Sequence, residues 1–167
     1  MQDEASALAA HEALLFDDFH FLLEFDPAKP WPNFLRAIDD QRRGVDLAEN
    51  QVRATQLVAE VDGELVGRTS IRFELSGFLA TTGGHIGYCV VPTHRRKGYA
   101  TEILRQALVV IRAEGIDRVL VTCGDDNAGS RRVIESCGGA FESIVPLEEG
   151  QSLCRDDEKS VRRYWIE

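Results

Sequence analysis

The sequence lacks several features that would place the protein in a membrane or an oxidising compartment. It has no apolar run of about eighteen residues, and residues 1–4 are acidic where a secretory signal peptide would be basic. The four cysteines show no paired spacing of metal ligands, so we expect free thiols, no metal and a cytoplasmic location. There is no internal repeat or low-complexity tract. A chain of 167 residues with 44% hydrophobic residues therefore predicts a single domain, 1–167, with a substantial core.

Positive charge is also scarce. The chain has 19 lysines and arginines against 28 aspartates and glutamates, for a net charge of −9. Such a protein repels phosphate backbones and acidic lipid surfaces, so neither a nucleic acid nor a membrane is an expected partner. The charge mildly favours a cationic partner such as an amine, although for the surface as a whole solubility is the simpler explanation.

One stretch, residues 84–101, departs from this acidic background. Residues 86–90 alternate in the manner of a strand rich in β-formers, and Pro92 ends the pattern because proline cannot donate to a ladder. From residue 100 to 111 apolar side chains recur at three and four residues, which predicts a helix. Gly115 is placed to close that helix in a left-handed conformation.

The junction between this strand and this helix is rich in basic residues. Residues 94–97 read His-Arg-Arg-Lys and stand directly before Gly98. The first N–H groups of a helix have no intrahelical partner and carry the positive end of its dipole, so they bind anions such as phosphate. A solvated basic loop before an ordinary helix would have the same composition, and both interpretations remain open here. A Walker loop does not fit, since Lys97 precedes its glycine, and no dinucleotide fingerprint is present.

The rest of the chain predicts helices at both ends of a sheet-forming core. A helix is expected over 5–23, followed by a proline-rich break and a short helix over 33–42. Asp62-Gly63 supplies the positive φ angles of a tight hairpin turn between two strands. The remaining expected elements are loops at 44–51 and 76–83, a strand at 119–123, a helix from 126–130 to 137–139, and strands at 141–145 and 161–166 joined by an acidic loop, 146–159. This order predicts a mixed sheet with helices on both faces.

Residues 95–100, Arg-Arg-Lys-Gly-Tyr-Ala, resemble the Arg/Gln-x-x-Gly-x-Gly/Ala segment of the GNAT superfamily of acetyl-CoA-dependent N-acetyltransferases. The strand ending in Val-Pro is similar to that family's fourth strand, and the segments around Asn127 and Phe141 resemble its later motifs. The resemblance covers about 55–145. It implies an α/β (mixed α+β) GNAT-type fold, with a central mixed, mostly antiparallel twisted sheet of six or seven strands flanked by about four helices. Residues 1–50 would form a helical substrate side, 55–145 the acetyl-CoA-binding core, and 146–167 an acidic loop and terminal strand. The family's usual strand before the first helix has no counterpart in the sequence.

The resemblance also implies the residues that bind acetyl-CoA. The pantetheine arm would pair with the backbone of Cys89, Val90 and Val91. The pyrophosphate would lie against Arg95, Arg96, Lys97, Gly98, Tyr99, Ala100 and Thr101. Asn127 and Ser130 would face the cofactor arm, and Asn127 is in addition a preferred N-cap of the helix that it precedes.

The catalytic groups are less evident. Family members often use a glutamate near the start of the fourth strand as general base, and His85 occupies about that place. A neutral imidazole at neutral pH can act as a base, but a histidine that only hydrogen-bonds a neighbour is an equal alternative. Glu74 is a second candidate. Many family members carry a tyrosine that acts as general acid seven residues after the asparagine, and Ile134 stands at that place here. Either Tyr88 or water would then protonate the departing thiolate, or the thiolate would leave without being protonated.

These features together predict an N-acetyltransferase that moves an acetyl group from acetyl-CoA to a primary amine of a small molecule or peptide, by direct attack in a ternary complex. A covalent cysteine route lacks a recognisable His-acid pair. The alternative is a catalytically silent acyl-CoA-binding or regulatory module. A nucleic-acid binder that uses the basic turn is disfavoured by the net charge. A homodimer is expected only as the commonest oligomer.

Overall fold

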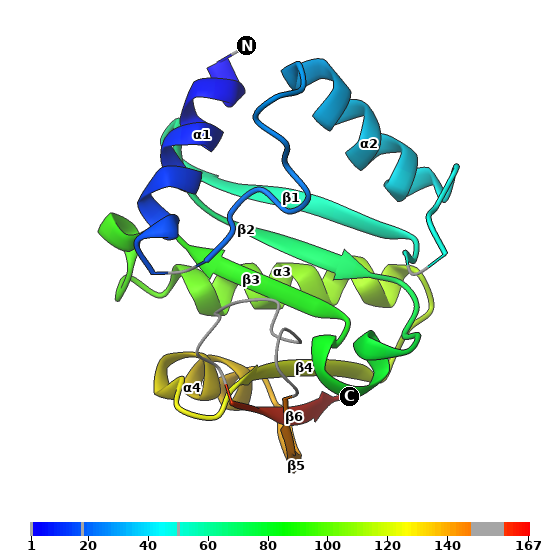
Figure 1. Ribbon diagram of the computed structural model, residues 1–167. Helices are drawn as coiled ribbons and strands as arrows, with labels where there is room; N and C mark the ends of the chain where they lie inside the picture. Colours follow the sequence, from blue (N-terminus) through cyan, green and yellow to red (C-terminus); the bar gives the residue numbers. More distant parts are fainter. Residues whose placement is uncertain (1, 18, 50, 148–158) are drawn as a thin grey trace.

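A computed structural model describes residues 2–17, 19–49, 51–147 and 159–167 (Figure 1). These residues form four α-helices and six strands, with a π-helical turn η1 and a 3₁₀ turn η2. In chain order they are α1 (Gln2–Leu15), α2 (Trp31–Arg43), β1 (Ala54–Val61), β2 (Glu64–Arg72), η1 (Leu79–Gly83), β3 (Ile86–Val90), η2 (Pro92–His94), α3 (Tyr99–Ala113), β4 (Val119–Gly124), α4 (Ala128–Ser136), β5 (Ala140–Pro146) and β6 (Ser160–Ile166).

The strands form one sheet in the order β1-β2-β3-β4-β6-β5. Every neighbouring pair is antiparallel except β3 and β4, which are parallel and are connected through α3. The sheet is therefore mixed and mostly antiparallel, with six strands flanked by four helices among the described residues, and the predicted fold class is confirmed.

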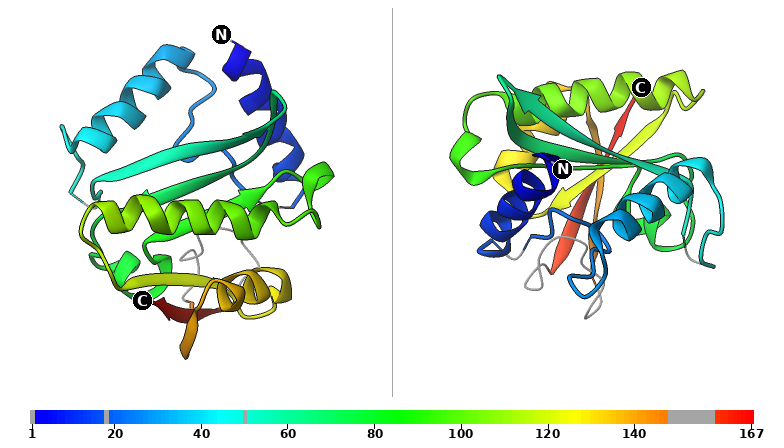
Figure 2. Two further views of the ribbon diagram at one scale, coloured as in Figure 1. Left: turned by 180° about the vertical axis from the view of Figure 1, so that it is seen from behind. Right: turned by 90° about the horizontal axis from the view of Figure 1, so that it is seen from above.

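Helices cover both faces of the sheet, each over its own apolar cluster. The buried side of α3, including Leu104 and Ile111, packs with Ile86 and Val121 of the sheet. On the other face α1 and α2 place Leu14 and Phe34 against Cys89 and Val91. Figure 2, seen from above, shows α3 on one side of the sheet and α1 and α2 on the other. None of the helices in the described ranges is both long and apolar enough to span a bilayer.

The first helix is shorter than the predicted 5–23. It ends at Leu15, where the amide of Asp17 turns back to the carbonyl of Leu14. The amide of Phe19 also donates to the Leu14 carbonyl, so the helix ends in a local turn. Farther along, the carbonyls of His20 and Phe21 accept hydrogen bonds from Arg68 of β2 at 2.8 and 2.6 Å, which fix the chain that follows the turn.

Other boundaries differ less. The second helix begins at Trp31, two residues before the predicted start, with proline in its first turn. Strand β2 ends at Arg72, so Glu74 lies in the following loop and is exposed. The predicted loop 76–83 contains η1. Most of the predicted acidic loop 146–159, with Cys154, lies outside the described residues.

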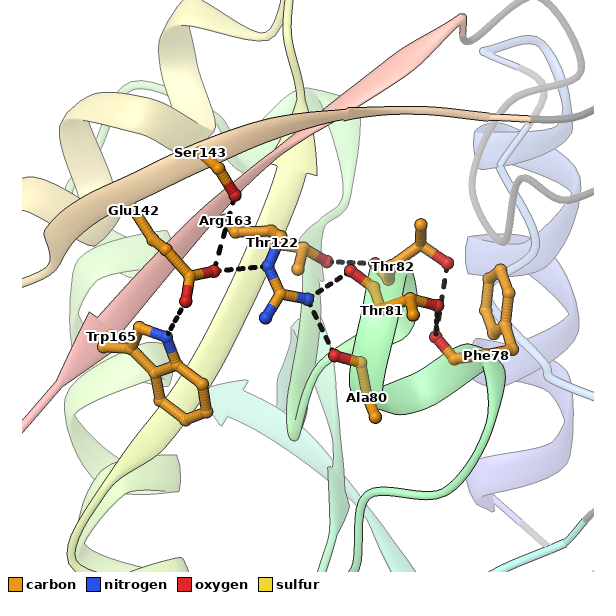
Figure 3. Close-up of polar contacts among 9 residues, drawn as sticks. All are labelled: Phe78, Ala80, Thr81, Thr82, Thr122, Glu142, Ser143, Arg163 and Trp165. Carbon is orange, nitrogen blue, oxygen red and sulfur yellow. Dashed lines mark hydrogen bonds and ion pairs between the residues drawn. The ribbon is translucent and has the colours of Figure 1, made fainter.

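Hydrogen bonds anchor the connection between β2 and β3 to strands β4 and β6. Arg163 of β6 donates to the carbonyls of Ala80 and Thr81 in η1, and its charge is balanced by Glu142 of β5 (Figure 3). Thr122 of β4 donates from Oγ1 to the carbonyl of Thr82 at 2.7 Å. These contacts bind the entry of β3 to β4 and β6.

Candidate active site

The parallel strands β3 and β4 are joined at one end and open at the other. At the joined end the His85 N–H donates to the Leu120 carbonyl at 2.8 Å, and the Leu120 N–H donates to His85 Nδ1 at 2.9 Å. The only register pair between the two strands within the described residues is Ile86 with Val121. Beyond it the strands diverge toward their carboxyl ends, at the left of Figure 1.

The divergence exposes one edge of β3. The Val91 N–H donates to the Val66 carbonyl, so the odd residues of β3 direct their backbone groups toward β2. Because hydrogen-bonding direction alternates along a strand, Tyr88 and Val90 direct theirs toward the opening. The Val90 carbonyl accepts from Arg95 Nε at 3.2 Å.

The turn after β3 presents a row of backbone N–H groups. Arg96 and Gly98 both have left-handed φ angles, of 65° and 88°, which bring the chain round into α3. The amides of residues 96–100 have no acceptor within the described part of the chain. Gly98 is the N-cap and supplies no side-chain oxygen. No carboxylate of the described ranges caps these amides, and this geometry suits an anion.

Helix α4 begins on the opposite side of the opening. Asn127 is its N-cap and accepts the Ser130 N–H at Oδ1, 2.9 Å away. The Ser130 hydroxyl lies 2.7 Å from the Tyr88 hydroxyl, which links α4 to β3 across the divergence. Burial raises the pKa of Tyr88, so its phenol stays protonated at neutral pH.

A cleft of about 890 Å³ lies between these elements. Most of the predicted cofactor residues line it, together with Tyr88: Cys89, Val90, Arg95, Arg96, Gly98, Tyr99, Ala100, Thr101, Asn127 and Ser130. Tyr88 and Ser130, which are 42 residues apart in the chain, are thus brought to one cavity.

Four predicted residues are not among those that line the cleft. Val91 already uses its N–H on Val66 and its C=O on the His94 amide, so its backbone is satisfied within the protein. Lys97 lies in the turn, but its side chain does not line the cavity. Glu74 is exposed in the loop after β2, at the end of that strand remote from Val90.

His85 is buried, with 6% of its surface exposed. A neutral imidazole has one acceptor nitrogen, and here Nδ1 already accepts the Leu120 N–H, so Nε2 carries the proton. Burial first, and then the charge of Arg72, lowers the pKa of His85. His85 thus joins β3 to β4 through its imidazole, and neither His85 nor Glu74 lines the cleft, while the assignment of a general base stays a prediction.

Some lining residues had no signal in the sequence. Leu14, Asp17 and Phe19 reach the cleft from the end of α1 and the segment after it. Asp17 forms an ion pair with Arg95, 2.6 Å between Oδ2 and Nη2, across the cavity. The other unpredicted lining residues are His94, Asp126, Ala128, Gly129, Arg132 and Val133.

A model of the acetyltransferase (GNAT) family matches residues 16–139. The chain belongs to the GNAT acetyltransferase family. Among solved structures, RimJ of Mycobacterium smegmatis in complex with CoA-disulfide is similar at a TM-score of 0.68 and 23% identity, over 97% of this chain and 77% of that one. The microcin C7 self-immunity acetyltransferase MccE, in complex with acetyl-CoA and AMP, gives 0.67 and 16%, over 99% and 86%.

A third solved structure is yncA, a putative acetyltransferase from Salmonella typhimurium with its cofactor acetyl-CoA. It matches at a TM-score of 0.62 and 18% identity, over 99% of this chain and 89% of that one. No curated protein matches the sequence. At these identities the structures establish that the GNAT fold is shared, and several of them bind acetyl-CoA or coenzyme A.

Proposed function

We propose that this GNAT protein transfers an acetyl group from acetyl-CoA to a primary amine by direct attack. The observation that carries the proposal is the position of the five acceptor-free amides of residues 96–100 beside the exposed edge of β3, in one cleft. If the anionic end of a ligand binds those amides, the cleft has room for the rest of the ligand to lie along the backbone of Tyr88 and Val90. The residues that line the cleft from β3 and from α4 fit acetyl-CoA, which supplies the thioester when bound.

The chemistry assigned to the protein is limited to few groups. The lone pair of the amine attacks the thioester carbon, the C–S bond breaks, and the Tyr88 hydroxyl gives its proton to the departing sulfur. The nitrogen loses one proton to water as the amide forms, and Tyr88 regains a proton from water. Since neither His85 nor Glu74 lines the cleft, we assign the proton of the ammonium to solvent. The rate at low amine concentration should then rise with pH until the amine's own pKa is reached.

The alternative proposal is a catalytically silent acyl-CoA-binding module. Two observations favour it: Ile134 stands where a tyrosine is usual in the family and is fully buried, and the acceptor nitrogen of His85 is occupied. Both proposals require binding of coenzyme A, so binding does not distinguish them.

Turnover distinguishes the two proposals. The purified chain is incubated with acetyl-CoA and phenethylamine, ethanolamine or a peptide with a free N-terminus, and thiol release and acetylated product are measured. Gly98→Val serves as the binding-deficient control, because a β-branched residue is strained at φ 88°. Product above this control supports the transferase. Binding of coenzyme A by calorimetry without product supports the silent module, and no binding at millimolar concentration removes both.

A further inference from the structure

Arg68 of β2 is the one lysine, arginine, aspartate or glutamate that is buried in the described part of the chain, with 3% of its surface exposed. A buried charge is costly unless it is paired or fully hydrogen-bonded. The contacts of its guanidinium within the described residues are with the segment after α1 and not with a carboxylate. The burial of Arg68 therefore points to a structural or functional role for its guanidinium.

One guanidinium holds three consecutive residues of that segment. Nε donates to the Phe21 carbonyl at 2.6 Å and Nη2 to the His20 carbonyl at 2.8 Å. The Arg68 Cζ also lies 5.5 Å from the centre of the Phe19 ring, within the range of a cation–π contact. Charge-assisted bonds from the planar fork of arginine fix both position and orientation, which the single ammonium of lysine does not.

The segment has no helix or strand of its own, and it crosses the face of β2 and β3 between α1 and α2 (Figure 1). Its backbone is also held to α1, since the Phe19 N–H donates to the Leu14 carbonyl at 3.1 Å and the Leu22 N–H to His11 Nδ1 at 3.2 Å. Phe21 and Leu22 are buried in the cluster that includes Cys89. Phe19, in contrast, lines the cleft.

The register of the sheet places this segment close to the part of the cleft that Tyr88 and Cys89 line. Arg68 stands directly opposite Cys89, which lines the cavity next to Tyr88. Neighbouring strands lie about 4.8 Å apart, so the guanidinium and the Phe19 ring are one strand away from the edge of β3. A change in the position of Arg68 is therefore transmitted to the cleft wall through Phe19.

We propose that Arg68 is a positioning residue that holds Phe19 in the acceptor-facing wall of the cleft, and that Phe19 selects amines that carry an apolar group. The inference rests on the proposed function, because it names the class of acceptor. Phe19 and Leu14 form an apolar wall of the cleft. The Phe19 ring, which contacts the buried guanidinium of Arg68, offers a flat surface to an aryl or alkyl group. A hydroxyl-bearing amine gains nothing from this wall.

The test compares phenethylamine with ethanolamine as acceptors for wild type, Phe19→Ala, Arg68→Lys and Arg53→Lys. Arg53→Lys is the matched control, because Arg53 also lies over a phenylalanine ring, Phe73, but does not line the cleft. We expect Phe19→Ala and Arg68→Lys to lower kcat/KM for phenethylamine about tenfold through KM, with kcat and the Kd of coenzyme A within about twofold. The control should retain the preference of the wild type.

Two results would overturn the inference. The first is a weakened Kd for coenzyme A with an unchanged ratio between the two amines, since Phe19 would then face the cofactor. The second is an Arg68→Lys variant whose Leu22 amide exchanges hydrogen no faster than that of Arg53→Lys, since Arg68 would then not hold the segment. The exchange measurement needs no turnover. If the wild type acetylates neither amine, the acceptor role falls with the proposed function, while exchange still decides the role of Arg68.

Discussion

Gly67 of β2 offers a direct test of the link between strand packing and the cleft. A Cβ at this position would lie 2.4 Å from the Cys89 carbonyl oxygen and 2.9 Å from Cδ1 of Ile103. Real Cβ contacts essentially never fall below 3.0 Å, so in Gly67→Ala the carbonyl must move by at least 0.6 Å. Cys89 belongs to the strand whose free edge lines the cleft, and the displacement therefore reaches the proposed coenzyme A site.

The magnitude follows from the kind of contact. Forcing one extra carbon into a well-packed site typically costs about 1–3 kcal/mol. We expect Gly67→Ala to lower the free energy of unfolding by this amount in urea titrations. We also expect the Kd of coenzyme A, measured by calorimetry, to rise about tenfold, since shifts well under 1 Å at a binding edge degrade its alignment.

Gly129→Ala is the control for stability. Its Cβ would meet only Asn127 Oδ1, at an ordinary 3.5 Å, and alanine is favoured over glycine in a helix. This variant should be as stable as the wild type or more so. The reasoning is refuted if Gly67→Ala unfolds at the same urea concentration as the wild type and binds coenzyme A equally well, because β2 and β3 would then have more freedom than their contacts indicate.

Three further predictions concern the cleft and its joined end. Tyr88→Phe should lower kcat about tenfold in the thiol-release assay while the Kd of coenzyme A stays within about twofold, and an unchanged kcat would exclude Tyr88 as the proton donor. Asn127→Ala should cost about 1 kcal/mol of stability through the lost cap on Ser130, and Asn127→Ser should restore stability but not affinity for coenzyme A. Recovery of both would reduce Asn127 to a cap. The pKa of His85 is lowered from 6.5, so the unfolded chain binds a proton that the folded chain excludes, and stability should fall as the pH drops below 6.5. His85→Gln, which keeps an acceptor for Leu120 but binds no proton, should show a shallower decline in urea titrations at each pH, and an equal decline would contradict the assignment.

The parts of the fold that sequence predicted correctly are those whose cause is local. Asp62 and Gly63 have φ angles of 52° and 80°, as the hairpin turn requires. Gly115 has a φ of 81° at the end of α3, and Asn127 caps α4. In each case the residue type and its immediate neighbours determine the backbone conformation, so no knowledge of distant contacts is needed.

The features that the sequence did not reveal depend on distant residues. Arg68 binds the Phe21 carbonyl from 47 residues away and so holds the segment after the first helix, in which Phe19 lines the cleft. Leu120, 35 residues from His85, occupies the nitrogen that a general base would need. Nothing in the sequence around Arg68 or His85 identifies the residues that each of them contacts. Their roles could not be inferred from spacing or composition.

The position of the cleft itself follows from the one parallel pair in the sheet. Parallel strands that are connected by a helix end at the same edge, so β3 and β4 both finish at the opening and the helices that follow them both begin there. The amino ends of α3 and α4 therefore converge on one cavity, and each contributes the positive end of its dipole. This resolves the apparent conflict between a net charge of −9 and an anion site, because the backbone rather than the overall charge supplies the attraction. It also explains why the joined end matters: if His85 and Leu120 did not hold the strands together there, the two helix ends would not be kept at a fixed separation.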